Sequence, residues 1–187
     1  MSEELYLPLT VGRGVEASRN NGTIFTYNPT ATGVNANTKT YIYGGTERWY
    51  YNWYAATAEK DINATDDVDG SICPKGWKLP YNYTISDTVS WGALTNAYNI
   101  TTNGTKVSTL TGYLVLEAYP LSLLRSGLYY YGTFSAGASG VYWSSTASDA
   151  SSARDLDYNI NSVDPQSGFS KPNGGLPIRC LASPLVH

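Results

Sequence analysis

The chain has 187 residues, which is enough for one well-buried domain and short for two. Only 14% of them are charged, the net charge is −3, and no cluster of lysine and arginine occurs, so nucleic-acid binding is not expected. Tyrosine (17 residues) and glycine (18 residues) are abundant. Because tyrosine offers a large amphipathic contact area at a small cost in rotamer entropy, this composition is typical of a β-rich or loop-rich recognition protein.

The sequence contains no apolar run as long as a transmembrane helix, so membrane insertion is not expected. No signal peptide is visible, because residues 1–4 lack the basic and apolar regions of such a segment. Either the protein is not exported by that route or its first residues have been removed, and the sequence leaves both open.

Residues 1–45 are rich in turns that contain asparagine, proline and glycine. Short strands are expected between these turns, at residues 23–27 and 40–43. An aromatic run follows at residues 48–54 and predicts a strand with at least one buried face.

Residues 59–70 are acidic and polar, and they predict a loop. Their aspartates and Gly70 suggest a calcium site. However, Thr65 stands at the first ligand position of an EF-hand loop, and Gly76 stands where the bidentate glutamate belongs. We therefore expect a solvated acidic loop.

Residues 73–80 predict a compact turn followed by a strand. A helix is expected from a cap at Ser86 or Asp87 to about Tyr98, because apolar side chains recur there at helical spacing. Residues 113–119 predict a further strand.

The last third of the chain, residues 128–171, uses mostly serine, tyrosine, aspartate and glycine. It contains no glutamate and no methionine, and Trp143, Gln166 and Lys171 are the only residues of their types in it. Antibody loops have a similar composition, in which tyrosine supplies contact area while serine, glycine and asparagine adapt their hydrogen bonds. We therefore expect the ligand-contacting surface here.

Within this stretch, residues 143–146 predict a strand that enters the core, and residues 176–181 predict a closing strand. Residues 153–160 alternate with a period of two. The inward-facing set is expected to be Leu156, Tyr158 and Ile160. The solvent-facing set is expected to be Asp155, Asp157 and Asn159. The same alternation also fits the wet face of an ordinary sheet, so it does not establish binding by itself.

The two cysteines, Cys73 and Cys180, lie far apart in the sequence and neither belongs to a Cys-x-x-Cys pair. His187 is the only histidine, so neither a zinc site nor a Cys-His or Ser-His catalytic pair can be assembled from local spacing. The cysteines are expected to be structural, either bridged or buried, rather than reactive. A bridge would require an oxidising setting or a thermophilic host.

Four blocks occur in this order: residues 51–58 (Tyr-Asn-Trp-Tyr-Ala-Ala-Thr-Ala), 72–80 (Ile-Cys-Pro-Lys-Gly-Trp-Lys-Leu-Pro), 142–146 (Tyr-Trp-Ser-Ser-Thr) and 178–180 (Ile-Arg-Cys). Together they resemble the C-type-lectin-fold domains of microbial surface proteins, the group also called Fibrobacter succinogenes major paralogous domains. The resemblance implies an α+β fold: a single C-type-lectin-like domain with short twisted antiparallel strands, one or two helices and many ordered loops. That domain would span residues 1–187, with N-terminal strands and loops at 1–45, a scaffold at 46–126 and a variable ligand-binding region at 127–180.

The region 127–180 resembles the variable region of a diversity-generating retroelement target protein. In such systems a reverse transcriptase copies a template with errors at adenines, and many template codons are AAC. Changes in the first two bases of AAC give Asn, Tyr, Ser, Asp, Gly, Ala, Thr, Ile and Val among others. They never give Lys, Glu, Gln, Met or Trp.

The resemblance implies a scaffold that includes Trp77, Trp143, Cys73 and Cys180, with no catalytic residue, no metal and no cofactor. It also implies that positions carrying the permitted residue types contact the ligand. Those positions are Tyr130, Tyr131, Thr133, Ser135, Ser139, Val141, Ser148, Asp149, Ser151, Ser152, Asp155, Asp157, Asn159, Ile160, Asn161, Ser162, Asp164, Ser167, Gly168 and Ser170. The two tyrosines are the expected hot spots, because exposed aromatic side chains bury the most area on binding.

Other activities of related folds fit less well. Calcium-dependent lectins use Glu-Pro-Asn or Gln-Pro-Asp followed by Trp-Asn-Asp, whereas here Lys171 replaces the acidic ligand and two serines follow Trp143. Formylglycine-generating enzymes need reactive cysteines close together. A hydrolase that uses Asp155, Asp157 and Asp164 is conceivable, but surface aspartates are common.

The sequence therefore predicts a non-catalytic protein that recognises a macromolecular ligand, a cell-surface protein or glycan. Its expected location is the surface of a prokaryotic cell or a virion. The alternative is an undiversified microbial adhesin or carbohydrate-binding domain of the same fold.

Overall fold

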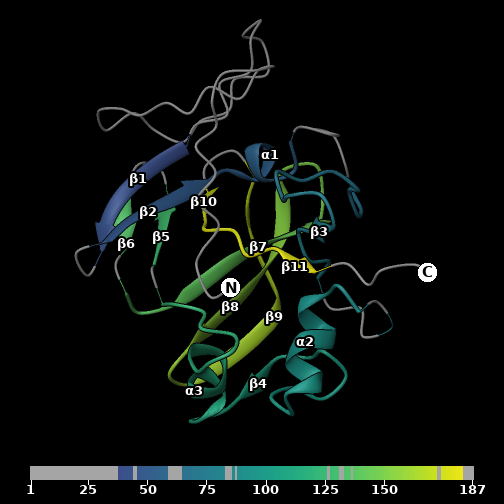
Figure 1. Ribbon diagram of the computed structural model, residues 1–187, viewed down its shortest axis with the longest axis vertical. Helices are drawn as coiled ribbons and strands as arrows, with labels where there is room; N and C mark the ends of the chain where they lie inside the picture. Colours follow the sequence, from purple (N-terminus) through teal and green to yellow (C-terminus); the bar gives the residue numbers. More distant parts are fainter. Residues whose placement is uncertain are drawn as a thin grey trace, which may run out of the picture.

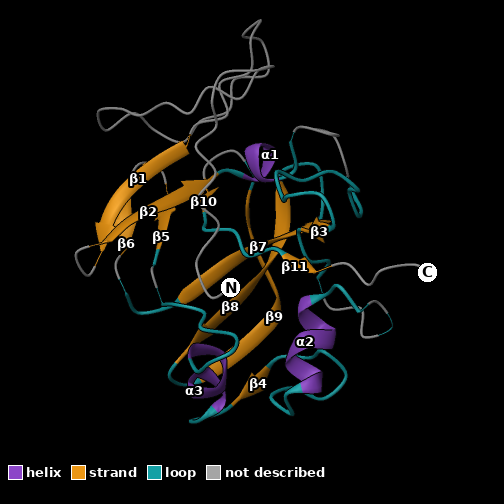
Figure 2. Cartoon of the chain, viewed as in Figure 1, coloured by secondary structure: helices purple, strands orange, loops and turns teal. Residues whose placement is uncertain are grey.

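The computed structural model of this chain describes residues 38–43, 46–58, 65–82, 86, 88–125, 127–130, 133–135, 137–171 and 174–182. Short strands, a few short helices and many loops make up this part of the chain, so the expected α+β class is confirmed (Figure 2). The ladders between the strands are antiparallel. The strand expected at residues 23–27 lies outside the described residues.

The largest sheet has four strands in the order β4-β9-β8-β7. Their bounds are β4 Val107–Ser108, β7 Gly140–Ala147, β8 Ser152–Asn159 and β9 Ser162–Ser170. The strands β7, β8 and β9 follow one another in the chain and pair as an antiparallel meander across the middle of the molecule (Figure 1). The strand expected at residues 143–146 is confirmed within β7.

One face of this sheet packs on α2 (Trp91–Ala97) and α3 (Gly112–Glu117), and we call it the helix face (Figure 1). The expected inward orientation of Leu156 and Tyr158 is confirmed, because both are fully buried on this face. Ile160 was expected beside them but is 49% exposed, since β8 ends at Asn159 and Ile160 lies in the turn. The buried side chains of the helix face are Trp91, Leu116, Leu123, Tyr142, Leu156, Tyr158 and Val163.

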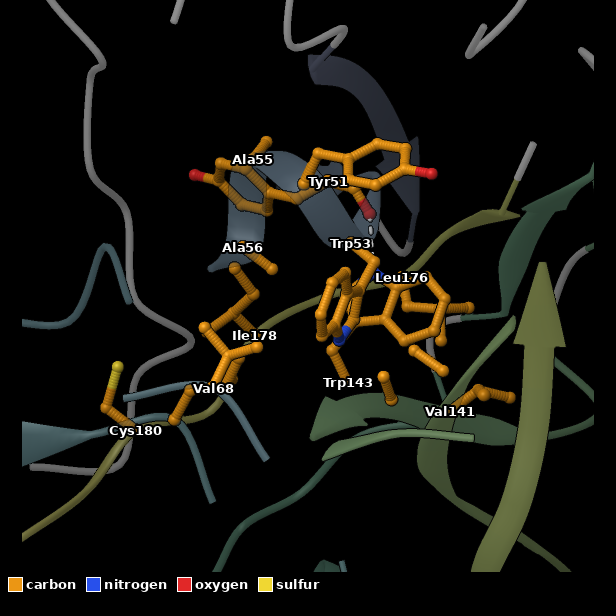
Figure 3. Close-up of a cluster of buried hydrophobic side chains, with 14 residues drawn as sticks. Tyr51, Trp53, Ala55, Ala56, Val68, Val141, Trp143, Leu176, Ile178 and Cys180 are labelled. Atoms are coloured by element: carbon orange, nitrogen blue, oxygen red, sulfur yellow. Dashed lines mark hydrogen bonds between the residues drawn. The ribbon is translucent and has the colours of Figure 1, made fainter. Parts of the chain in front are cut away.

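The other side of the sheet is covered mainly near β7, and we call it the open face. There it packs on α1 (Trp53–Ala56) and on Leu176 in a cluster around Trp53 and Trp143 (Figure 3). The indole nitrogen of Trp143 donates to the carbonyl of Tyr51 at 2.7 Å, and that of Trp53 donates to the carbonyl of Ser144 at 2.9 Å. Both buried indole N–H groups are therefore satisfied, which ties α1 to β7.

The aromatic run forms a strand only in its first part. The hairpin of β1 (Thr38–Tyr43) and β2 (Thr46–Tyr51) confirms the strand expected at residues 40–43. The expectation of a strand through residue 54 is wrong, because the side chain of Asn52 accepts from the backbone nitrogen of Ala55 at 2.9 Å and starts α1.

The helix α2 begins later than the sequence predicts. Its N-cap is Ser90, whose hydroxyl accepts from the backbone nitrogen of Ala93 at 3.0 Å. A helix start at Ser86 is wrong, because Ser90 still pairs with Tyr81 in an isolated bridge, in which the backbone nitrogen of Tyr81 donates to the carbonyl of Val89 at 2.9 Å. The other expected cap, Asp87, lies outside the described residues.

The strand expected at residues 113–119 is wrong, because this segment contains α3. Gly112 and Leu116, four residues apart, are its buried residues, as expected for one side of a helix. A short apolar run cannot be assigned to a helix or a strand by periodicity alone.

Two smaller sheets complete the described strands. One contains β10 (Gly174–Gly175), β5 (Leu128–Tyr130) and β6 (Thr133–Ser135), in that order. The other pairs β3 (Trp77–Lys78) with β11 (Leu181–Ala182). The closing strand expected at residues 176–181 is wrong for most of its length: Leu176 pairs with Tyr51 in an isolated bridge and only Leu181 enters a ladder.

Cys73 and Cys180 form a disulfide with Cα atoms 5.9 Å apart and 107 residues apart in sequence. Of the alternatives that the sequence leaves open, the bridged one is therefore observed. Within the described residues, none of the helices has both the length and the apolar character that crossing a membrane requires.

Candidate ligand-contact surface

Most of the predicted ligand-contacting residues fall on the β5–β6 hairpin, the open face of β8 and β9, and the two turns that flank β8. The others are Ser139 and Val141 at the start of β7, and Ser152, Gly168 and Ser170 on the side of the helix face. Most of the predicted residues are exposed or half-buried, and Tyr131 lies outside the described residues. The two exceptions, both buried, are Val141 and Asp155.

The pairing of β8 with β9 places several predicted residues on the open face. Residues directly opposite in an antiparallel ladder point to the same side of the sheet. The opposed pairs on this side are Asp155 with Ser167, Asp157 with Asp164 and Asn159 with Ser162. All except Asp155 are half-buried, so solvent reaches these side chains.

Asp155 does not face solvent as the alternation predicts. Its residue is 0% exposed, and neither carboxylate oxygen has a well-formed hydrogen bond. Asp155 pairs with Trp143 across the ladder to β7, and Val141, the neighbour of Asp157 on that strand, is also buried. The expectation is wrong because the cluster around Trp53 and Trp143 covers the β7 side of the open face.

Burial and like charge act together on the carboxylates of the open face. Desolvation, and then the charge of Asp157, raise the pKa of Asp155 well above its ordinary value. Desolvation, and then the charge of Asp164, raise the pKa of Asp157. Lys106, which the sequence did not single out, has its ammonium nitrogen 3.4 Å from Oδ2 of Asp164.

The β5–β6 hairpin presents Tyr130, Thr133 and Ser135, all of which are exposed. Tyr130 is 44% exposed, and its ring meets that of Phe169 edge-on with 4.9 Å between centroids. Because Phe169 and Ser167 lie two residues apart on β9, this contact brings Tyr130 toward the carboxylates of the open face.

The two turns lie at opposite ends of β8. In the first, Asp149 accepts from the backbone nitrogens of Ser151 at 2.7 Å and Ser152 at 2.8 Å, and these hydrogen bonds lower its pKa. In the second, Asn159 accepts from the backbone nitrogen of Asn161 at 2.8 Å. At about 3.4 Å per residue, the ends of β8 are roughly 24 Å apart.

The predicted residues therefore do not form one compact patch. The open face brings together Asp157, Asp164 and Ser167, and Tyr130 contacts Phe169 further along the same side of β9. The ladder places Ser152, Gly168 and Ser170 on the side of the helix face instead. Ser148, Asp149 and Ser151 lie at one end of β8, and Ile160 and Asn161 at the other.

The interspersed residues of other types hold the backbone. The side-chain amide of Gln166 donates to the carbonyl of Gly104 at 2.9 Å. Lys171 is fully buried, with its ammonium nitrogen 4.5 Å from the centroid of the Trp53 ring. Trp77, which was predicted to belong to the scaffold, is 39% exposed, and its backbone pairs with Ala182 in the ladder of β3 with β11.

The acidic loop carries exposed aspartates, as expected. The hydroxyl of Thr146 donates to the carboxylate of Asp67, which joins the loop to β7. Across the described part of the chain, no three histidine, cysteine, aspartate or glutamate side chains are grouped so that they could hold a metal ion.

No protein-family model matches this chain, and no curated protein and no solved structure shows significant similarity to it. What the protein does is therefore inferred from its own residues and their geometry.

Proposed function

We propose that this protein is a non-catalytic ligand-binding protein in which a C-type-lectin scaffold presents a contact surface made by the β5–β6 hairpin and the open face of β8 and β9. The carrying observation is the separation of two sets of residues within residues 128–171. Trp143, Gln166 and Lys171 hold the backbone, whereas most positions of the permitted types are open to solvent.

The same separation supports diversification by a retroelement. A region that accepts many substitutions needs a backbone fixed by residues that do not vary, and side chains that solvent reaches. On the open face, Asp157, Asp164 and Ser167 stand on strands whose other side is anchored by Tyr158 and Val163. Substitution at such positions changes surface chemistry with little change in packing.

One observation favours the second candidate, an undiversified adhesin or carbohydrate-binding domain of the same fold. Val141 and Asp155 carry permitted residue types, yet both are buried. A buried position accepts few side-chain volumes, because protein interiors are close-packed. Random substitution at these two sites would often destabilise the protein.

Nucleotide sequences from several isolates distinguish the two candidates. Diversification predicts substitutions confined to positions that are adenine in a template repeat, beside a reverse transcriptase gene. Changes spread evenly over the chain and its codon positions would exclude it. The codons of Val141 and Asp155 are informative, since constancy there would place them in the scaffold.

Binding is tested with the intact protein on an array of purified extracellular proteins and glycans. Tyr130→Ala is expected to lose most of the signal on any ligand retained by the parent protein, because truncating an interface aromatic costs about 2 kcal/mol or more. Tyr98→Ala is the matched control, since Tyr98 is similarly exposed, at 37%, but lies at the end of α2. Equal loss in both variants would place the contact surface elsewhere.

A further inference from the structure

The open face concentrates negative charge between two neighbouring strands. Asp155 and Asp157 stand two residues apart on β8, and Asp157 lies directly opposite Asp164 on β9. Alternation along β8 puts both of its carboxylates on the same side of the sheet. Three carboxylates therefore lie on one side of the sheet, where Asp157 and Asp164 are half-buried and Asp155 is buried.

These carboxylates are poorly compensated from within the described part of the chain. Asp155 is wholly buried with neither oxygen in a well-formed hydrogen bond, and Oδ1 of Asp157 is also buried without a hydrogen-bond partner. The cation seen beside them is Lys106, whose side chain is 63% exposed; it contacts Asp164, and its charge also lowers the pKa of Asp157, though less than burial and Asp164 raise that pKa. An exposed lysine is well hydrated and contributes little to an ion pair.

Arg154, the neighbour of Asp155, is directed elsewhere. Its guanidinium donates from Nη1 to the carbonyl of Gln166 at 3.0 Å, and alternation places its side chain on the side opposite to Asp155. The positive charge of Arg154 lowers the pKa of Asp155, but this is the smallest of the effects on that pKa.

Aromatic surface lies on the same side of the sheet, beyond the pair of Asp155 and Ser167. Tyr130 and Phe169 meet edge-on at 4.9 Å, and Phe169 stands two residues from Ser167 on the same side of β9. An arginine or lysine side chain needs both features: an anionic partner for its head and apolar surface for its methylene stem. The guanidinium group also suits paired carboxylate oxygens.

We propose that the open face receives a cationic side chain, arginine or lysine, from a protein partner, with Asp157 and Asp164 as the contacting carboxylates and Tyr130 along the stem. The inference rests on the proposed function and selects a basic protein ligand over a glycan, since most sugars of glycans are neutral or acidic. A metal ion is disfavoured, because these carboxylates are not grouped as ligands.

The test uses the intact protein and Nα-acetyl-L-arginine amide as the probe, followed by two-dimensional NMR of the backbone amides. Saturable shifts are expected at Asp157, Asp164 and Ser167. Nα-acetyl-L-citrulline amide has nearly the same shape without the charge, and is expected to cause no saturable shift. Equal shifts with both probes, or none with arginine, would overturn the proposal.

Protein variants locate the site. Asp157→Asn combined with Asp164→Asn is expected to weaken arginine binding about tenfold or more, because hydrogen bonds to charged groups contribute about 1.5–3 kcal/mol. Asp69→Asn makes an isosteric loss of charge in the acidic loop, outside the candidate contact surface, and is expected to leave binding unchanged. Each single variant is measured as well, and a well-dispersed spectrum shows that the fold is intact.

The proposed contact surface and the proposed basic ligand can be overturned independently of each other. Loss of array binding in Tyr130→Ala, without any arginine binding, would overturn only the basic ligand. An acidic or neutral glycan retained on the array through Tyr130 would do the same. Absence of any ligand that depends on Tyr130 would overturn the proposed contact surface itself.

Discussion

At the scale of single residues, the side chains that break the expected pattern are the informative ones. Asp155 follows the alternation of β8 but is buried, because Trp53 and Trp143 cover the β7 side of the open face. Alternation tells which residues share a side of a strand. It does not tell what packs on that side, since the covering residues come from distant parts of the chain.

Removal of this buried charge is expected to stabilise the fold. The pKa of Asp155 is raised in the folded protein, so the unfolded chain releases its proton first, at a pKa of about 3.9. The contribution of the Asp155 carboxyl to the free energy of unfolding is therefore fully present below that pH. It is lost as the pH rises through the pKa that Asp155 has in the folded protein. Asp155→Asn should raise the denaturation midpoint at pH 7.

The measurement is urea unfolding of the parent protein and Asp155→Asn between pH 3 and pH 8. The difference in midpoint should be smallest at the acidic end and grow with pH. Asp149→Asn is the control, because hydrogen bonds lower the pKa of Asp149 and its charge favours the fold. A difference that does not vary with pH would contradict the raised pKa of Asp155.

At the scale of elements, a helix or strand could be predicted from the sequence where the interactions that fix it are between residues close together in the chain. The strand around Trp143 could be predicted because its pattern of side chains is local. The helices α1 and α3 could not, since they are short and their residues also suit strands. The start of α2 at the Ser90 cap could not be singled out, because Ser86 and Asp87 are equally suitable cap residues and no local pattern reveals the bridge between Tyr81 and Ser90.

The two helix starts provide a matched pair of substitutions. Ser90→Ala removes the hydroxyl that accepts from the backbone nitrogen of Ala93, and should lower the free energy of unfolding by about 0.5–2 kcal/mol. Thr111→Ala, at the N-cap of α3, should have a smaller effect because Thr111 makes no side-chain cap hydrogen bond. Denaturant unfolding checks both, and a larger loss in Thr111→Ala would contradict this assignment.

At the scale of the whole molecule, composition and the four sequence blocks predicted the α+β class. The candidate surface could be predicted as a stretch of sequence but not as a shape. Its residues divide between the open face, the hairpin and two turns at opposite ends of β8. Lys106 belongs beside Asp164 only because β4 pairs with β9, a contact between segments far apart in the chain.

The disulfide joins residues that are 107 positions apart in the sequence, and its removal is expected to lower the stability of the fold. Chain entropy assigns a loop of about this length roughly 4–5 kcal/mol of stabilisation. Cys73→Ser combined with Cys180→Ser should therefore lower the denaturant midpoint markedly. Treatment of the parent protein with a reductant should reproduce the effect, and a thiol titration reports whether the bridge has opened. An unchanged midpoint would show that the bridge does not contribute to stability.

The position of this bridge also governs how the chain responds to tension. The separation of 107 residues would correspond to about 350 Å of extended polypeptide. A pull on the two ends of the chain passes through the covalent link between Cys73 and Cys180 and bypasses everything between them. The whole candidate contact surface lies inside that loop. As long as the bridge is intact, the backbone between Cys73 and Cys180 is therefore not extended by the pull, although stretching the segment before Cys73 would break the contacts of Tyr51 and Trp53 with β7.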